Sequence, residues 1–376
     1  MYKQKILILG DGLTGALASS ELSKLDIEIE TASFGNNFKN DTTIALSSSN
    51  YNYLKKSFYD NEISKIFWPV KKIKIYDLTK NVLELVHFDS FPNHENIIYV
   101  GYGYKIQSFL KKQIKYKNLK TKIFSPKKIK KILKYNVPYQ LILNCTGNRS
   151  WISKDYLKIK KIKKKYNQSA ITAIVKHNKI KNNIARQIFC QEGPLAILPI
   201  SSNKSSLVWS INNYSLLDSN KKIRKQLVYK LRSILSNFFV IKNISKLILR
   251  DLNFSLSQKY FFNRVLSLGD SLHTIHPLAG QGFNMTIRDI KILKKILNSK
   301  INLGLDLGDA TTLNEFSEKT KSNNFAFANL VDFLHYLFSK QNKFFKKIRN
   351  FTLRRIDEKT TVKKFFVKIA DEGLRF

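Results

Sequence analysis

The stretch RVLSLGDSLHTIHPLAGQGFNMTIRD, residues 264–289, decides the fold. Its first residues predict a short buried strand that ends at a Gly-Asp turn, Gly269 and Asp270. A second glycine-rich loop, residues 277–284, follows and leads into a helix whose apolar residues recur with helical spacing. Glycines let backbone N–H groups face a ligand, and the N-terminus of a helix favours negative charge. This stretch therefore predicts a site for a ligand that carries negative charge.

A second glycine turn stands in KILILGDGLTGALAS, residues 5–19. Its motif Gly10-x-Gly12-x-x-Gly15 follows a predicted strand and opens a predicted helix, the context that a dinucleotide-binding turn requires. The acid that holds a ribose in such folds is expected about 20 residues after the first glycine. That spacing indicates Glu30, with Thr31 as the alternative for the strand end. Two such loops, far apart in sequence, predict one nucleotide cofactor held from both sides and favour a flavoprotein enzyme.

The order of predicted elements indicates an α/β protein with a discontinuous nucleotide-binding domain. The chain opens with a βαβ unit, changes to alternating strands typical of an antiparallel sheet at 168–210, and returns to the first domain near residue 264. From about residue 310 the pattern is helical. The expected parts are an FAD-binding Rossmann-like domain at 1–70, 96–157 and 250–300, an inserted substrate domain at 71–95 and 158–249, and a C-terminal helical region at 301–376.

The composition of the chain indicates which kinds of binding partner to expect. The chain has 376 residues and a formal net charge of +39, but its lysines are scattered along the sequence, which argues against a nucleic-acid partner. Such a basic surface favours weak contact with anionic lipid headgroups. Two cysteines, no leader and no apolar run long enough to span a bilayer predict a cytoplasmic protein, with peripheral contact at the cytoplasmic face of the inner membrane. In the C-terminal segment 325–353, aromatic residues and lysines fit an interfacial membrane helix, and a packed helix with solvated lysines is the alternative.

Two features restrict the chemistry further. His273 and His276 form an H-x-x-H pair, but no third and fourth ligand stand at useful spacing, so no metal is expected. The first arginine in the chain is Arg149, so any guanidinium contact to a cofactor must come from later in the sequence, or a lysine must replace it.

These motifs resemble the single-component flavin-dependent aromatic hydroxylases with the para-hydroxybenzoate hydroxylase fold. Within them, the chain looks most like the ubiquinone-biosynthesis hydroxylases, the group that contains 2-octaprenyl-6-methoxyphenol hydroxylase. The resemblance rests on GDSLHTIHPLAGQGFNMTIRD at 269–289 and GPLAILPISSNKSSLVWSI at 193–211, with weaker matches at 42–54, 86–90 and 366–374. It implies non-covalent FAD, NAD(P)H as reductant and O2 as co-substrate. The implied reaction is hydroxylation of a polyprenylated phenol through a flavin C4a-hydroperoxide, with other ubiquinone-biosynthesis proteins as candidate partners.

The resemblance also implies roles for individual residues. Asp270 would hold the ribityl chain, and Pro277, preceded by His276, would lie at the reacting face of the flavin. The residues implied in cofactor binding are Gly10, Gly12, Leu13, Thr14, Gly15, Glu30, Thr31, Gly147, Gly269, Asp270, Gly280, Gln281, Gly282, Phe283 and Asn284. On the substrate side the implied residues are Pro194, Leu198 and Trp209, with core packing as the alternative for each.

Three departures from the family pattern bear on function. Thr42 stands where an arginine is usual, Cys145-Thr146-Gly147 replaces an Asp-Gly turn, and no arginine occurs at 104–108. They motivate a second hypothesis, a non-catalytic member of a ubiquinone-biosynthesis assembly that keeps the fold and the FAD. The intact loop from Gly280 to Gly282 favours the enzyme, because a scaffold does not need that loop.

Overall fold

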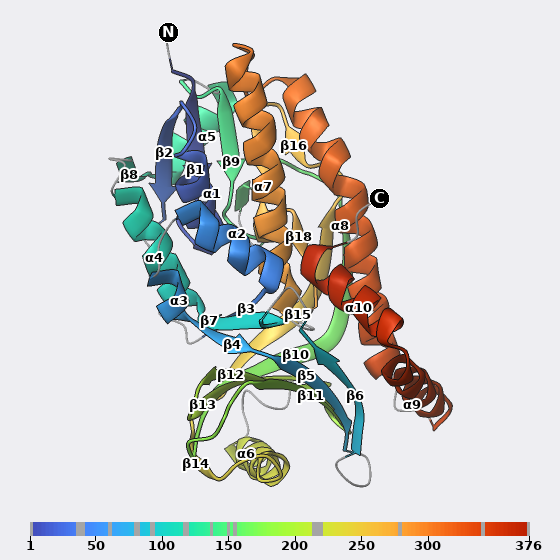
Figure 1. The fold of residues 1–376 in the computed structure, drawn as a ribbon. Helices are drawn as coiled ribbons and strands as arrows, with labels where there is room; N and C mark the ends of the chain where they lie inside the picture. Colours follow the sequence, from blue (N-terminus) through green and yellow to red (C-terminus); the bar gives the residue numbers. More distant parts are fainter. Residues whose placement is uncertain are drawn as a thin grey trace.

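The structure is a computed structural model that describes most of the chain. The described residues are 3–34, 42–58, 62–78, 83–90, 95–115, 120–135, 138–148, 151–152, 156–212, 221–276, 280–339 and 343–373. In this part the strands form three sheets, and Figure 1 shows the largest lying below the sheet that carries the chain's start. The result is an α/β fold with an inserted sheet and C-terminal helices.

The first sheet is mostly parallel and contains the opening of the chain. Apolar strands such as KILIL and LILN are buried on both faces, as parallel sheets require. Helices α1 (Leu13–Leu22), α4 (Gly103–Lys115) and α7 (Gln281–Asn302) cover one face, and α5 (Pro126–Tyr135) covers the other. The order of its described strands is β16 (Phe261–Phe262), β17 (Val265–Ser267), β9 (Leu141–Asn144), β1 (Lys5–Leu9), β2 (Glu28–Ser33) and β8 (Lys120–Ile123).

The second sheet is almost wholly antiparallel. Its strands alternate, so one face packs on α6 (Lys221–Leu235) and the other faces the first domain. Figure 1 shows α6 below this sheet. The order of its described strands is β18 (His273–Thr274), β15 (Ile248–Ser257), β10 (Lys161–His177), β13 (Lys204–Asn212), β12 (Gly193–Ser201), β11 (Ile184–Cys190), β5 (Lys72–Asp77) and β6 (Leu83–Asp89), with β14 (Ile241–Ile244) beside β10.

A small third sheet and the remaining helices connect the two. In the described chain its strands are β3 (Thr43–Ser47), β7 (Ile98–Tyr102) and β4 (Phe67–Val70). The remaining helices are α1 (Leu13–Leu22), α2 (Ser48–Phe58), α3 (Glu62–Ile66), α4 (Gly103–Lys115), α5 (Pro126–Tyr135), η3 (Gly269–Ser271), α7 (Gln281–Asn302), α8 (Ala310–Ser339), α9 (Lys343–Glu358) and α10 (Thr360–Glu372). In the described part, no helix combines the length and apolar character needed to cross a membrane.

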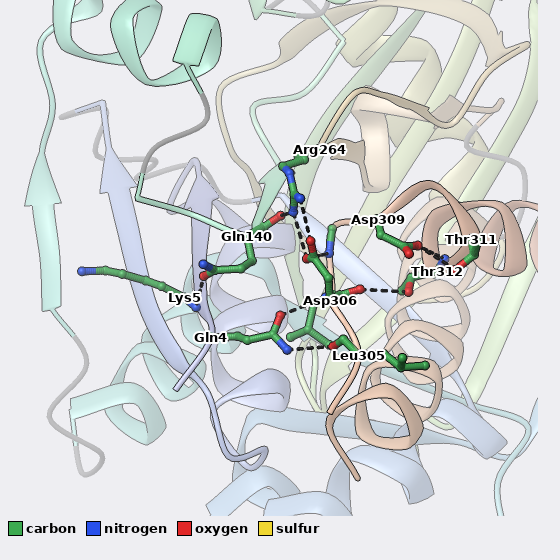
Figure 2. Close-up of polar contacts among 11 residues, drawn as sticks. Gln4, Lys5, Gln140, Arg264, Leu305, Asp306, Asp309, Thr311 and Thr312 are labelled. Atoms are coloured by element: carbon green, nitrogen blue, oxygen red, sulfur yellow. Dashed lines mark hydrogen bonds and ion pairs between the residues drawn. The ribbon is translucent and has the colours of Figure 1, made fainter. Parts of the chain in front are cut away.

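A polar network fastens the loop between α7 and α8 to the amino ends of the strands (Figure 2). Arg264 donates to both carboxylate oxygens of Asp306, at 2.8 and 2.6 Å, and to the carbonyl oxygen of Gln140 at 2.9 Å. Gln4 donates to the carbonyl oxygen of Leu305 at 2.7 Å. This edge of the sheet is therefore closed by structural contacts, which leaves the carboxyl edge for a ligand.

Close packing at this closed edge gives a stability prediction. A Cβ on Gly308 would lie 1.7 Å from the carbonyl oxygen of Gln140. We expect Gly308→Ala to lower the free energy of unfolding by about 3 kcal/mol, because backbone must move to admit the methyl group. Arg264→Met, which removes a half-exposed ion pair, should cost less than about 1 kcal/mol. Urea unfolding of both variants measures the difference, and equal losses would contradict the steric account.

Candidate active site

Three turns meet at the carboxyl edge of the first sheet. Strands β1, β9 and β17 are parallel neighbours, so the turns that follow them lie side by side. A Cβ on Gly269 would stand 2.5 Å from Oγ1 of Thr14, and one on Gly10 would stand 2.8 Å from the carbonyl oxygen of Cys145. The Leu268 N–H also donates to the Asn144 carbonyl oxygen at 3.0 Å. The two glycine motifs, far apart in sequence, are therefore in direct contact.

The glycines of the first turn have different functions. A Cβ on Gly15 would lie 1.8 Å from the carbonyl oxygen of Gly10, so only glycine lets helix α1 start this close to the strand. Gly10 has a φ of +101°, which favours glycine for its backbone conformation. By contrast, nothing lies within 4 Å of a Cβ placed on Gly12 or Gly147. The chain packs tightly behind the turn and leaves open space in front of it.

Side chains of α4 secure this turn from the other side. Gln107 donates to the carbonyl oxygen of Asp11 at 2.7 Å, and Lys111 pairs with the Asp11 carboxylate at 2.8 Å. Gly12 is the N-cap of α1 and gives it no side-chain cap. The helix therefore begins with backbone N–H groups that are free of a side-chain cap and can donate hydrogen bonds to a bound anion. Gln107 lies in the segment 104–108, where the sequence resemblance led us to expect an arginine, and here it holds the turn.

Glu30 and Thr31 occupy β2 but not its end. In the register of the sheet Glu30 pairs with Leu7, whereas the strand continues to Ser33. The Glu30 carboxylate accepts a hydrogen bond from Tyr139 at 2.7 Å and pairs with Lys122 at 2.8 Å. Burial raises the pKa of Glu30, but hydrogen bonds from Lys122 and Tyr139 outweigh it and hold the pKa below its usual value. The structure thus brings neither predicted ribose residue to the glycine turn, and Thr31 instead contacts Ser19 of α1 at 3.0 Å.

Asp270 is an exposed residue in a buried run. Its neighbours Gly269 and Ser271 are buried, and its own side chain reaches solvent at the edge where the turns meet. The dense surrounding protein raises its pKa, while His273 and Lys161 act in the opposite direction. The Ser271 hydroxyl accepts a hydrogen bond from the Gly147 N–H at 2.9 Å, which joins this turn to the middle one. Asp270 therefore presents a carboxyl group beside the open space at Gly147.

The start of α7 carries the second predicted loop. Gly280 adopts φ +64° as its N-cap, and a Cβ there would lie 3.2 Å from that of Ala45. Asn284 is buried and fully engaged with the chain: its Oδ1 accepts from the Ser47 N–H at 3.0 Å, and its Nδ2 donates to the Ala45 carbonyl at 2.9 Å. Asn284 therefore fixes the helix start on β3, a positioning role that its side chain performs within the protein.

Two neighbours leave this helix start open toward a ligand. Gln281 is buried, and its Oε1 has no hydrogen-bond partner in the described structure. Nothing lies within 4 Å of a Cβ on Gly282. Phe283 packs against the core of the first domain. The first turn of α7 thus combines an uncapped N-terminus, an unoccupied acceptor and free space.

The predicted histidines are buried in two separate arrangements. His276 stacks on His335 with ring centroids 4.0 Å apart, and burial together with His335 lowers its pKa well below the usual value, so it is neutral at pH 7. His273 contacts the Asp289 carboxylate at 2.7 Å and thereby joins β18 to α7. Pro277 lies outside the described residues. No group of side chains in the described part has the composition of a metal site.

A cavity of about 490 Å³ lies between the second sheet and the α7 loop. Leu198 lines it, together with Gly280 and Gln281. Pro194 and Trp209 do not line the cavity. Trp209 is fully buried in the core between the second sheet and α6, and its Nε1–H donates to the Gly193 carbonyl oxygen at 3.2 Å. Alternation along β13 explains the placement, because Val208 faces the cavity and Trp209 the opposite side.

Sequence reasoning missed two parts of the cavity wall. Phe366, Val367 and Ala370 of α10 line it, and Asp371 anchors that helix by accepting a hydrogen bond from the Ser49 N–H at 2.7 Å. Arg250 of β15 donates to Thr42 Oγ1 at 2.8 Å, which brings a guanidinium to the residue where the sequence resemblance led us to expect an arginine. A strand residue more than 200 positions away gives no local signal, whereas the match at 366–374 hinted at α10.

Comparison with known proteins fits this geometry. Residues 130–310 match the family model described as an FAD binding domain. The chain is 26% identical over 275 residues to the ubiquinone biosynthesis monooxygenase COQ6 of Dictyostelium discoideum (61% of this chain, 55% of that one). It is 27% identical over 218 residues to the ubiquinone hydroxylase UbiL of Rhodospirillum rubrum (54% and 48%), so it spans about half the length of these relatives. The chain thus contains a match to an FAD binding domain and is similar in sequence to a monooxygenase and a hydroxylase named for ubiquinone.

Solved structures share the fold of this chain. The p-nitrophenol 4-monooxygenase PnpA of Pseudomonas putida superposes with a TM-score of 0.79 over 100% of this chain and 99% of its own, at 11% identity. A point variant of HpxO from Klebsiella pneumoniae, solved with FAD, gives 0.74 over 98% and 99%, at 12% identity. At such identities the likeness concerns the fold.

The residues at the three turns and at the start of α7 fit FAD. Open space at Gly12, Gly147 and Gly282 would be filled by any Cβ, helices α1 and α7 start without side-chain caps, and the buried Gln281 acceptor lacks a donor in the described structure. These are the groups that a diphosphate and an amide-bearing ring would satisfy. The turns of Gly10–Gly15 and Gly147 would hold the diphosphate, and the first turn of α7 would hold the ring.

The open space at Gly12 gives a prediction about the cofactor. Its backbone is extended, with φ −64° and ψ −171°, which any residue adopts, and serine is a favourable N-cap. We therefore expect Gly12→Ser to leave the unfolding of flavin-free protein unchanged. Its hydroxyl would compete with the diphosphate, so FAD affinity should fall at least about tenfold, the equivalent of one hydrogen bond to a charged group. Fluorescence titration with FAD measures it, and unchanged affinity would place the diphosphate elsewhere. Gly10→Ala is the contrasting variant and should fail to fold stably.

Proposed function

We propose that this protein is an FAD-dependent monooxygenase that hydroxylates the ring of a polyprenylated phenol in ubiquinone biosynthesis, with NAD(P)H as reductant and O2 as co-substrate. The sequence relatives support the pathway, since COQ6 is named a ubiquinone biosynthesis monooxygenase and UbiL a ubiquinone hydroxylase. The family model supports the cofactor. When bound and reduced by NAD(P)H, FAD would supply the chemistry that transfers one atom of O2 to an activated ring, with the other atom released as water.

The observation that carries this proposal is the position of the cavity. It borders Gly280 and Gln281 on one side and the strands of the second sheet on the other. Its lining is predominantly apolar and of a size typical of small-molecule sites. A ring held there would lie between the α7 loop and the substrate sheet, and an apolar side chain would find matching walls. The residues that supply these walls are Ile73, Ile75, Phe88, Ile97, Ala196, Leu198, Val208, Leu334, Phe366 and Val367.

The roles of the protein groups follow from this arrangement. The positive end of the α7 helix dipole would stabilise negative charge that develops on the flavin ring next to Gly280–Gly282. The apolar walls would exclude water, which protects reactive species from hydrolysis. Gln281 lines the cavity, and its unpartnered Oε1 would accept a hydrogen bond from an N–H or O–H group of the substrate or cofactor. His276, neutral and buried, can accept a proton but carries no charge toward the site at pH 7.

The proposed reaction is tested with purified protein. We expect a yellow protein whose NAD(P)H oxidation is stimulated by a short-chain polyprenylphenol, with a hydroxylated product detected by mass spectrometry. A yellow but inert protein would support the non-catalytic alternative, and a colourless protein that does not take up FAD would reject the proposal.

A cavity variant makes the test specific. Ala196→Phe adds a ring on the cavity face of β12 and should raise KM for the phenol about tenfold or more with little change in FAD binding. Ile197→Val changes the next residue, which faces the α6 core, and should cost about 1 kcal/mol of stability without altering KM. Equal KM values in both variants would show that substrate binds elsewhere.

Exposed aromatics on the C-terminal helices support peripheral contact with a membrane, from which a polyprenyl substrate must be collected. Phe333 of α8, Phe351 of α9 and Phe365 of α10 are 56%, 63% and 60% exposed, on helices that also carry lysine and arginine. We expect the triple change of these residues to serine to reduce sedimentation with anionic phosphatidylglycerol vesicles, while binding to neutral vesicles stays weak throughout. Unchanged sedimentation would exclude this surface.

A further inference from the structure

Lys161, at the start of β10, reaches the place where the three turns meet. Its Nζ donates to the Ser271 carbonyl oxygen at 2.8 Å and to the Asn148 Oδ1 at 3.0 Å. Ser271 follows Asp270, and Asn148 follows Gly147, so this ammonium bridges the middle and last turns from behind the open space at Gly147. The lysine-rich stretch around it has the composition of a solvated strand edge, so the sequence does not reveal that Lys161 points inward.

The two acceptors of Lys161 are uncharged, which sets it apart from the other lysine at the turns. Lys111 is neutralised by a direct ion pair with Asp11. Lys161 is only partly exposed, and its two hydrogen bonds leave one of three N–H donors for another acceptor. A half-buried cation without a directly bonded carboxylate is costly unless an anion completes its surroundings.

The anion is identified by position and by what the chain lacks. Asp270, which attracts Lys161 electrostatically, presents its carboxyl group where the ribityl chain is proposed to lie. In FAD the ribityl chain is joined directly to the diphosphate. If Asp270 holds the ribityl chain, the diphosphate lies next to it, within reach of the Lys161 ammonium on Ser271 and Asn148. No arginine occurs before residue 149 to neutralise a diphosphate, and a lysine can do so as a point charge.

We propose that Lys161 is the cation that binds the diphosphate of FAD, bridging it to the turns of Gly147–Asn148 and Asp270–Ser271. This inference rests on the proposed FAD-dependent function and assigns to the second sheet a direct part in holding the cofactor. Strand β10 then connects the cofactor to the cavity, since Ala170 and Thr172 of the same strand line its wall.

Charge at Lys161 also predicts a pH dependence. Burial, with a smaller contribution from Lys163, lowers the pKa of Lys161 to about 8, while Asp270 opposes the shift. Below this pKa the ammonium is charged and binds a diphosphate; above it the charge is lost in the free protein. FAD affinity should therefore be level up to about pH 7.5 and fall as pH rises through about 8 to 9.5.

The experiment is a fluorescence titration of flavin-free protein with FAD, and with ADP as a probe that carries the diphosphate without the ring. We expect Lys161→Met to weaken both ligands about 10- to 100-fold at pH 7, the loss expected for a hydrogen bond to a charged group. Lys163→Met, an equal change of net charge on the exposed part of the same strand, should weaken them less than about threefold.

Lys161→Arg separates charge from local structure. Because arginine stays charged over this range, the variant should bind FAD within about threefold of the native protein at pH 7 and lose the decline above pH 8. If the native protein does not bind FAD, the proposed function fails. If it binds FAD and Lys161→Met binds FAD and ADP equally well, or if Lys161→Arg retains the native pH profile, the assignment of Lys161 is overturned.

Discussion

The contact between Gly15 and the carbonyl of Gly10 is the constraint on which the site depends. With no side chain at Gly15, helix α1 starts directly against the turn after β1, where any Cβ would lie 1.8 Å from backbone oxygen. That closeness aims the uncapped N-terminus of α1 along the carboxyl edge of the sheet. The turns after β9 and β17 then close on the same place, through Cys145 and through Gly269 against Thr14.

The glycines around the site fall into two groups, one that packs closely against the protein and one that faces open space. Gly10, Gly15 and Gly269 are in contact with backbone or side chains, so they set the shape of the edge. Gly12, Gly147 and Gly282 contact nothing within 4 Å of a Cβ, so they leave room for a ligand. The opposite edge of the sheet is instead closed by Arg264, Asp306 and the residues that they contact.

Local motifs predicted the turns well, while side-chain orientation and long-range partners needed the structure. The strand–turn–helix pattern around Gly10 and around Gly269 is written in adjacent residues, and both turns form as expected. Counting residues to Glu30 failed to reach the strand end, since β2 extends further along β1 than the spacing rule assumes. Lys161 was missed because its role depends on turns at Asn148 and Ser271 that no sequence pattern links to it.

The alternation of β12 and β13 has a wider consequence. Ala196, Leu198 and Val208 face the cavity, while Ile197 and Trp209 face the α6 core, so one layer of backbone separates the two. Residues that would contact a substrate therefore alternate, along the same two strands, with residues that stabilise the fold. A lineage of such proteins can reshape its pocket by changing every second residue, and leave undisturbed the interior that keeps the sheet folded.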